Sequence, residues 1–482
     1  MAGVDARIVL VGLPTIAEQL HAGVADLIWI TQAYLFAETI GLLLIGRTAD
    51  LVGRVKIYNY GFIVFTAGSA LAALSFNSFE LIVSRMVQGL GSSMMITNAA
   101  AILTDATPRN ELGKFLGLNS IAFRAGSVTG LTLSGVILAI TDWRALFYIN
   151  IPIGVFGTLW AHYRLKEAAV KDSYRGMDWI GFLVFSSGLG LVLLAITYLS
   201  FGLSGYSFGL PMLAFGIVLL VFFVYYELRG RMSTRPLLDM KLFKIREFAG
   251  GSTAMLINSI SWTGIMIMVS FYLQVILSES PLKTGLSLLA LDSTLIISAP
   301  LSGRLSDRYG SRAFVITGLA ISSSAFFIFG LFVNASTGIT TILFGLALLG
   351  VGTGMWFSPN TASIMGSVPA NRRGIASGFR MTMGNVGDTL SFGIAILIMT
   401  LVIPYSALNT LIDSYSIPGT VLLGRSEFIH GFQLVALILA SVNAIAIIPG
   451  SFAKKRSVAV TGDNGSTEKR DEENSMGRGV ED

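Results

Sequence analysis

Eight charged side chains interrupt the long apolar runs of this sequence. A charge at bilayer depth costs roughly 2.5–3.5 kcal/mol on insertion scales, so each one needs a partner or a wet cavity. Side chains in such positions bind protons, ions or charged solutes, and the balance of four acids and four bases favours mutual neutralisation. The acids are Asp5, Glu38, Asp292 and Asp388, and the bases are Arg7, Arg85, Arg124 and Arg380.

The depth of each charge suggests its chemistry. Glu38 lies eight residues from Gly46, ~12 Å into the bilayer at the helical rise per residue, which favours a cavity-facing proton or cation site. Asp292 is similarly deep. Arg124 lies in mid-span, where it can hold an anionic group of a substrate. Arg380 is closer to the membrane surface and can extend its side chain to water.

For each of these residues, the alternative is a static structural pair. Arg85 can pair with Asp5, and an acid that exchanges such a partner for a proton is a coupling site. Arg380 and Asp388 are eight residues apart, about 80° around a helix, so they do not pair with each other. Trp262 and Gln274 are candidates for lining a cavity, although aromatic residues in membrane helices more often serve packing or interface anchoring.

The composition places these charges in a membrane protein. Of 482 residues, 53% are hydrophobic and 13% charged, and the mean hydropathy is +0.72. A soluble domain of this length needs far more polar surface. The chain has no cysteine and three histidines, which excludes thiolate metal sites and leaves little for zinc, so we expect no cofactor. The net charge of +5 does not indicate nucleic-acid binding, because the basic residues lie in short loops.

Apolar runs of about 20 residues are long enough to cross the bilayer as helices. A first segment, 4–14, is too short to span alone and is no signal peptide, so we expect an incomplete first helix whose cytoplasmic half is missing. The total is then fourteen helices. The thirteen others are expected at 26–46, 57–75, 79–103, 114–140, 144–164, 178–199, 209–227, 248–278, 284–303, 313–333, 339–358, 374–403 and 427–450.

Loop charges orient this bundle. Taking alternate loops, 23 basic residues fall on one side, and Arg144, Lys283 and Arg425 fall on the other. The rule that positive loops stay inside predicts a multi-pass protein of the cell membrane with both termini in the cytoplasm. Residues 453–482 are polar and without periodicity, which predicts a disordered cytoplasmic tail.

The sequence repeats itself. Residues 46–53 (GRTADLVG) recur as 303–310 (GRLSDRYG), and five Gly or Pro positions recur at a constant offset of 261 residues. Both copies of each loop fall on the cytoplasmic side, which predicts two six-helix halves in parallel repeat with a site between them. We expect an N-terminal half at 1–165, two extra transmembrane helices at 166–246, a C-terminal half at 247–452 and the tail at 453–482. The recurring positions are Gly89, Gly91, Pro108, Gly113 and Gly117, with Gly350, Gly352, Pro369, Gly374 and Gly378.

At this point the chain resembles the major facilitator superfamily, and within it the fourteen-helix drug:proton antiporter group. Residues 46–56 are similar to the signature loop of that superfamily, and residues 303–312 are similar to the second copy of this loop. The resemblance implies gating roles for Gly46, Asp50, Gly53, Arg54, Gly303, Asp307 and Gly310. The stretch RMVQGLG at 85–91 resembles the family motif in which Arg85 serves proton coupling. The stretches WRALFYINIPIG at 143–154 and RPLLD at 235–239 resemble two further motifs of the group.

Two motifs depart from the pattern of the group. In the fifth span, Gly117, Gly126, Gly130 and Gly135 keep the glycine spacing of the antiporter motif, but Leu131 and Ser134 replace a proline and a glycine. In the first segment, Arg7 stands where the family has threonine, and Leu10 where it has asparagine.

The resemblance implies a secondary transporter, most simply a proton-coupled exporter of small amphipathic or drug-like compounds. Its partners are then a small-molecule substrate, protons and the lipid bilayer, and we expect a monomer. Proton-coupled uptake of an organic anion is the alternative, favoured by Arg7 and Arg124. A membrane-embedded transferase is a remote third, because the sequence has neither an acidic metal–diphosphate motif nor a Walker loop. We therefore expect no enzymatic activity.

Overall fold

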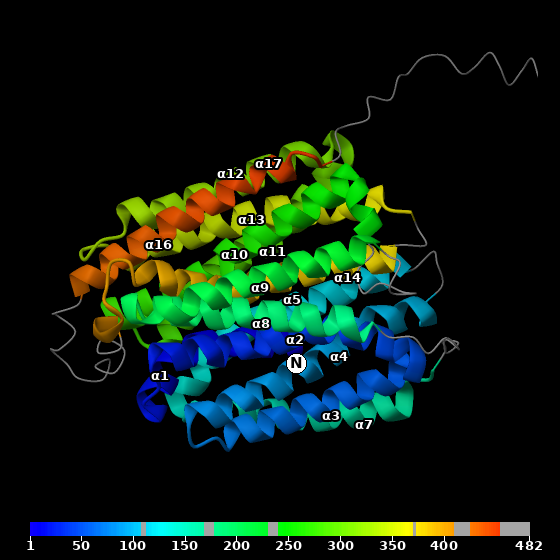
Figure 1. The fold of residues 1–482 in the computed structure, drawn as a ribbon, viewed down its shortest axis with the longest axis horizontal. Helices are drawn as coiled ribbons and strands as arrows, with labels where there is room; N and C mark the ends of the chain where they lie inside the picture. Colours follow the sequence, from blue (N-terminus) through cyan, green and yellow to red (C-terminus); the bar gives the residue numbers. More distant parts are fainter. Residues whose placement is uncertain (108–111, 168–177, 230–239, 370–372, 409–424, 454–482) are drawn as a thin grey trace, which may run out of the picture.

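The computed structural model describes residues 1–107, 112–167, 178–229, 240–369, 373–408 and 425–453. The first half of the chain forms helices that run side by side, and the N-terminus lies part-way along their length (Figure 1). These helices are α1 (Ala2–Leu20), α2 (Val24–Val52), α3 (Arg54–Ala73), α4 (Ser78–Ala106), α5 (Leu112–Ile140), the short α6 (Ala145–Tyr148) and α7 (Asn150–Arg164).

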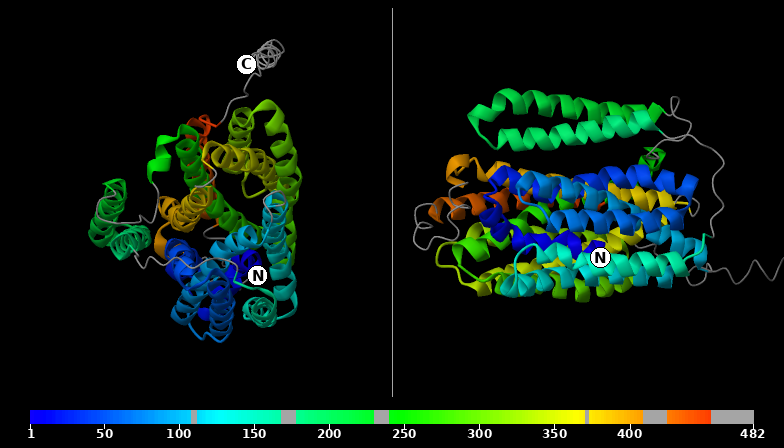
Figure 2. Two further views of the ribbon diagram at one scale, coloured as in Figure 1. Left: turned by 90° about the vertical axis from the view of Figure 1, so that its right-hand side faces the viewer. Right: turned by 90° about the horizontal axis from the view of Figure 1, so that it is seen from below.

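The remaining described residues form a second set of helices. Helices α8 (Trp179–Leu199) and α9 (Leu203–Arg229) pack on each other and lie outside the other helices, and α8 contacts α2 and α14 (Figure 2). The others are the 3₁₀ turn η1 (Met240–Lys244), α10 (Arg246–Phe271) with its π-helical continuation η2 (Tyr272–Ile276), α11 (Pro281–Tyr309), α12 (Ser311–Phe332), α13 (Ile339–Ser367), α14 (Arg373–Met399), α16 (Arg425–Ile445) and α17 (Ile447–Gly450).

Local sequence explains where several helices begin. Asn77 accepts a hydrogen bond from the backbone N–H of Glu80 at 2.9 Å and so caps α4. Asp178 caps α8 through the N–H of Gly181 at 2.8 Å. Ser280 precedes Pro281, the first residue of α11, where a proline loses no intrahelical hydrogen bond.

Eleven helices of the described residues are long and apolar enough to cross a membrane. Several of them extend past the predicted spans; α2, for example, continues to Val52 and α13 to Ser367. The prediction for the first segment was wrong in extent. Helix α1 has 19 residues instead of the eleven of 4–14, and spans about 28 Å at the helical rise.

The sequence repeat has a direct counterpart in the packing. A Cβ atom at Gly89 of α4 would collide with the carbonyl oxygen of Tyr34 in α2, and one at Gly350 of α13 would collide with that of Leu291 in α11. Glycine at these two positions lets the backbones of each helix pair approach closely. The equivalent pairs α2–α4 and α11–α13 therefore use the same contact, as a parallel repeat of two six-helix halves predicts.

Candidate functional site

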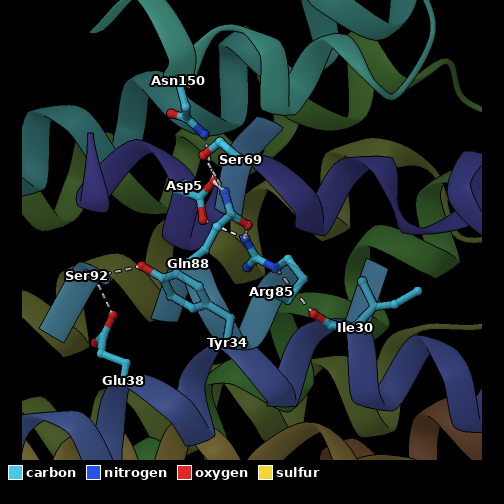
Figure 3. Close-up of polar contacts among 9 residues, drawn as sticks. All are labelled: Asp5, Ile30, Tyr34, Glu38, Ser69, Arg85, Gln88, Ser92 and Asn150. Carbon is cyan, nitrogen blue, oxygen red and sulfur yellow. Dashed lines mark hydrogen bonds and ion pairs between the residues drawn. The ribbon is translucent and has the colours of Figure 1, made fainter. Parts of the chain in front are cut away.

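A buried ion pair lies at the centre of the first half. Arg85 of α4 donates through Nη1 to Oδ2 of Asp5 in α1 at 2.6 Å (Figure 3). The second carboxylate oxygen of Asp5 accepts from Gln88 Nε2 at 3.3 Å and from Asn150 Nδ2 at 2.8 Å. Gln88 also donates to Ser69 Oγ at 2.7 Å. Asp5 is 0% exposed and thus desolvated, but three donors compensate its charge.

Arg85 has further partners besides Asp5. Its Nε donates to the carbonyl oxygen of Ile30 at 3.4 Å, and Nη1 also donates to Oε1 of Gln88 at 2.9 Å. The guanidinium carbon lies 4.3 Å from the ring centroid of Tyr34, within the range of cation–π attraction. These contacts would still hold the arginine if Asp5 lost its charge.

Glu38 joins this network to the second half of the chain. It is the middle residue of α2, and 7% of it is exposed. Ser92 Oγ donates to its Oε2 at 2.7 Å, and the Tyr34 hydroxyl donates to Ser92 at 2.9 Å (Figure 3). On the other side, Asn385 Nδ2 of α14 donates to Oε1 at 2.8 Å. Among the described side chains, Glu38 has neutral partners and no cation.

A second ion pair crosses between the halves. Nη1 of Arg7 in α1 donates to both carboxylate oxygens of Asp292 in α11, at 2.6 and 2.7 Å. The Arg7 guanidinium carbon also lies 4.6 Å from the ring centroid of Trp262 in α10. The side chain of Arg7 is 15% exposed and that of Asp292 is 4% exposed. Arg7, which replaces the threonine of the family motif, therefore links one half to two helices of the other.

The remaining charges lie in separate surroundings. Asp388 accepts a hydrogen bond from Thr263 Oγ1 at 2.9 Å, within its own half. Arg380 lies with its guanidinium 5.6 Å from the ring centroid of Phe357. The side chain of Arg124 lies outside the described part of the chain. Across the described ranges, no cluster of His, Cys, Asp or Glu is arranged to hold a metal ion.

Hydrogen bonds link α1 to α10 and its continuation η2. Pro14 lacks an N–H, so the carbonyl of Leu10 loses its helical partner. Ser270 Oγ donates to this carbonyl at 3.2 Å, and Gln274 Nε2 donates to the next carbonyl, that of Val11, at 3.2 Å. These two hydrogen bonds thus connect α1 of the first half to α10 and η2 of the second half.

The loop motifs end helices in both halves. Gly53 (φ 124°) follows α2 and Gly310 (φ 89°) follows α11, and both φ angles are in the region that favours glycine. The backbone N–H of Arg54 donates to Oε1 of Glu167 at 3.0 Å, so this carboxylate lies at the positive end of α3. Asp307 is exposed and Gly303 lies in the last turns of α11. The side chain of Asp50 and the surroundings of Gly46 are outside the described part.

The glycines of the fifth-span motif permit close helix contacts. A Cβ atom at Gly130 would collide with the carbonyl oxygen of Val4, and one at Gly126 would be in ordinary contact with the same residue. A Cβ at Gly135 would lie 2.9 Å from Pro281 O and from Leu282 Cα of α11. These positions therefore pack α5 against α1 and against the second half.

Several residues of the site were not predicted as site residues. Gln88 and Asn150 lie within the stretches 85–91 and 143–154, which resemble motifs of the family, so the sequence did contain a signal for them. Tyr34, Ser92 and Asn385 are neutral residues in apolar helices, and no local pattern distinguishes them from packing residues.

Known proteins share this architecture and sequence. The family model described as Major Facilitator Superfamily matches residues 1–238, 171–392 and 251–470. A riboflavin transporter, RibZ, of Clostridioides difficile is 28% identical over 81% of this chain and 83% of its own length. The tetracenomycin C resistance and export protein of Streptomyces glaucescens is 28% identical over 81% of this chain and 72% of its own.

Among solved structures, a bacterial homologue of the human lysosomal transporter Spinster, inward-facing and unoccupied, superimposes with a TM-score of 0.67. It is 13% identical and covers 94% of both chains, so it supports the fold alone. With the family match along nearly the whole chain, these findings identify a multi-pass membrane transporter of small molecules and not an enzyme. The chain belongs to the major facilitator superfamily.

Proposed function

We propose that this protein is a proton-coupled exporter of small amphipathic or drug-like compounds. The observation that carries the proposal is Glu38, a buried carboxyl group that receives one hydrogen bond from its own half and one from the other. A proton on this group changes a contact between the halves, as coupling to alternating access requires. The tetracenomycin C resistance and export protein of Streptomyces glaucescens, a relative named for export, supports the outward direction of transport.

The strength of the link between the halves depends on the charge of Glu38. Both neighbours, Ser92 and Asn385, donate to it, so both bonds are charge-assisted when the carboxyl is ionised. Protonation makes these bonds neutral and turns one oxygen into a donor. We expect a proton to loosen the α2–α14 contact, which also includes Thr39 and Thr389 with their hydroxyl oxygens 3.3 Å apart.

Asp5 and Arg85 are the second part of the proposed coupling. A proton on Asp5 removes the charge that holds Arg85, and the arginine keeps Ile30, Gln88 and the Tyr34 ring as partners. Because Tyr34 also donates to Ser92, the partner of Glu38, the two carboxyl groups are joined by one continuous set of contacts. We infer that their protonation states influence each other.

The arrangement in the membrane is part of the proposal. We propose that Gly53, Gly310 and both termini face the cytoplasm, and the excess of basic residues in the loops on that side supports this orientation. The functional unit is a monomer, because the helices that meet at Glu38 and Arg7 all come from one chain. The two halves at 1–165 and 247–452 then move against each other.

Proton-coupled uptake of an organic anion is the second candidate. The observation that favours it is the partly exposed Arg7 between the halves. The two candidates differ in the direction of the proton relative to the substrate, and that direction can be measured.

Purified protein in proteoliposomes tests both functions. The compounds named for the relatives, tetracenomycin C and riboflavin, serve as first substrates, with protein-free liposomes as the control. An exporter that exchanges substrate for protons accumulates the compound when the lumen is the more acidic side. A symporter accumulates it when the outside is more acidic. Equal uptake in both gradients and in none would contradict proton coupling altogether.

A further inference from the structure

Arg7 has unused hydrogen-bonding capacity at the centre of the bundle. A guanidinium carries five N–H donors, and the bonds to Asp292 use Nη1 alone. No residue in the described ranges accepts from Nε or Nη2. Both oxygens of Asp292, by contrast, accept from Arg7, and its side chain is only 4% exposed. The accessible member of the pair, with donors to spare, is therefore the arginine.

Trp262 provides a flat apolar surface beside these donors. The guanidinium carbon lies 4.6 Å from its ring centroid, which holds the cation over the indole. The tryptophan is partly exposed and adjoins Thr263 on α10. The guanidinium covers one face of the indole, and the partly exposed remainder of the ring can contact a planar aromatic group whose acidic oxygens reach Nε and Nη2.

We propose that Arg7 is a specificity-determining residue, which binds a carboxylate or similar acidic group on an aromatic amphipathic substrate through Nε and Nη2. Asp292 is a positioning residue that fixes the guanidinium by its bonds to Nη1. The proposal rests on the proposed transport function and names the substrate class of its central site.

The charges at the site favour an acidic substrate over a cationic substrate. A cation at Asp292 has to displace Arg7 from both oxygens, which leaves a desolvated guanidinium without its partner. An anion on the free donors keeps the pair intact and adds a charge-assisted bond. Among the described carboxyl groups, Asp388 also interacts electrostatically with Arg7, and it accepts a hydrogen bond from Thr263. A cation at Asp388 is the competing arrangement.

Three naphthyl probes of similar size and different charge test the class: 1-naphthoate, 1-naphthylmethylammonium and the neutral 1-naphthamide. Their binding to the purified full chain is measured by calorimetry in detergent, without a proton gradient. We expect the wild-type protein to bind naphthoate about tenfold more tightly than the ammonium probe, the equivalent of one charge-assisted hydrogen bond. Asp292→Asn should bind naphthoate more weakly, because the guanidinium is no longer held by two carboxylate oxygens, but should still prefer it to the ammonium probe, because Arg7 retains its charge.

The double variant Arg7→Gln/Asp292→Asn removes both charges and so avoids stranding either one in the interior. We expect it to bind the three probes alike. Arg144→Gln/Asp142→Asn is the matched control, since Arg144 also pairs with an aspartate (2.9 Å) and stacks over a tryptophan (4.5 Å), but lies near the end of the bundle.

A wild-type protein that binds none of the probes, or binds the ammonium probe as tightly as naphthoate, would overturn the proposal. So would a folded double variant with an unchanged preference. An unchanged affinity for naphthoate in Asp292→Asn would remove the positioning role. These binding measurements do not depend on gradient-driven flux. If proton coupling fails but the preference for naphthoate is preserved, the proposed function is contradicted and the proposed substrate class is not.

Discussion

Replacing Glu38 by glutamine keeps the size of the side chain and removes its ability to carry a charge. A hydrogen bond to a charged group contributes about 1.5–3 kcal/mol, and one between neutral groups about 0.5–1.5 kcal/mol. Each of the two bonds at Glu38 therefore weakens by about 1 kcal/mol. Only the bond from Asn385 joins the halves, so the variant should shift their equilibrium by about 1 kcal/mol, or roughly fivefold.

The assay compares two kinds of flux in proteoliposomes, with the substrate that the wild-type protein accumulates. Exchange of labelled for unlabelled substrate needs no net proton movement, and we expect Glu38→Gln to retain it. Accumulation driven by a pH gradient needs a site that gains and loses a proton, and we expect it to fall to the level of protein-free liposomes. Glu80→Gln, which neutralises an exposed carboxylate near the end of α4, should retain both activities.

The melting temperature of the purified variant separates coupling from folding. Glutamine can still accept from Asn385 through its amide oxygen, so we expect near-normal stability. If Glu38 is instead an essential counter-charge, its neutralisation strands a buried cation and lowers stability strongly. A well-folded Glu38→Gln protein that accumulates substrate at the wild-type rate, with the same pH dependence, would refute the reasoning.

Three further predictions follow from the structure. Asp5→Asn leaves the buried Arg85 without its counter-charge and should cost about 3–5 kcal/mol in the free energy of unfolding. The double variant Asp5→Asn/Arg85→Gln should regain most of this stability but should not regain gradient-driven transport. An Asp5→Asn protein as stable as wild type would contradict the pairing. Gly310→Ala forces a side chain into a backbone conformation with φ 89° and should destabilise by about 1–3 kcal/mol in thermal unfolding, whereas Gly366→Ala, where an added Cβ meets nothing within 4 Å, should not. Ser336→Cys in this cysteine-free chain should react with an impermeant maleimide added outside intact cells; protection there, with reaction only in opened cells, would reverse the proposed orientation.

The fold could be predicted from the sequence because it depends on patterns within single helices. The length of the apolar runs predicts the membrane-spanning helices. The recurring glycines, among them Gly89 and Gly350, mark positions where the backbones of two helices approach closely. The pairing of Asp5 with Arg85 could also be considered in advance, because few opposite charges exist at that depth. Partners on distant helices could not, since the hydrogen bond from Asn385 to Glu38 depends on how α14 is placed against α2.

The first helix illustrates a local rule overruled by tertiary contacts. The predicted segment 4–14 stops at Pro14, and proline removes a backbone hydrogen bond and usually interrupts a helix. In membrane proteins, neighbouring side chains can satisfy the carbonyl that proline leaves free. Ser270 of α10 does this for Leu10, so α1 continues to Leu20. The donor lies 260 residues away along the chain and gave no signal near the proline.

The two halves of the repeat share glycine contacts between helices but differ in their buried charged residues. At the offset of 261 residues that relates Gly89 to Gly350, Arg85 corresponds to Leu346 and Gln88 to Leu349, and both leucines are fully buried. The second half thus keeps the glycine contacts of its helix pairs and replaces the ion-pair network of the first half by apolar packing. Because only one half contains the Asp5–Arg85 network, a proton there acts on the second half only through contacts that cross between them. The described contacts between the halves that include a charged group are Glu38–Asn385 and Arg7–Asp292. Neutralising Glu38, or Arg7 and Asp292 together so that neither charge is stranded, should therefore uncouple substrate transport from proton movement while the packing within each half stays intact.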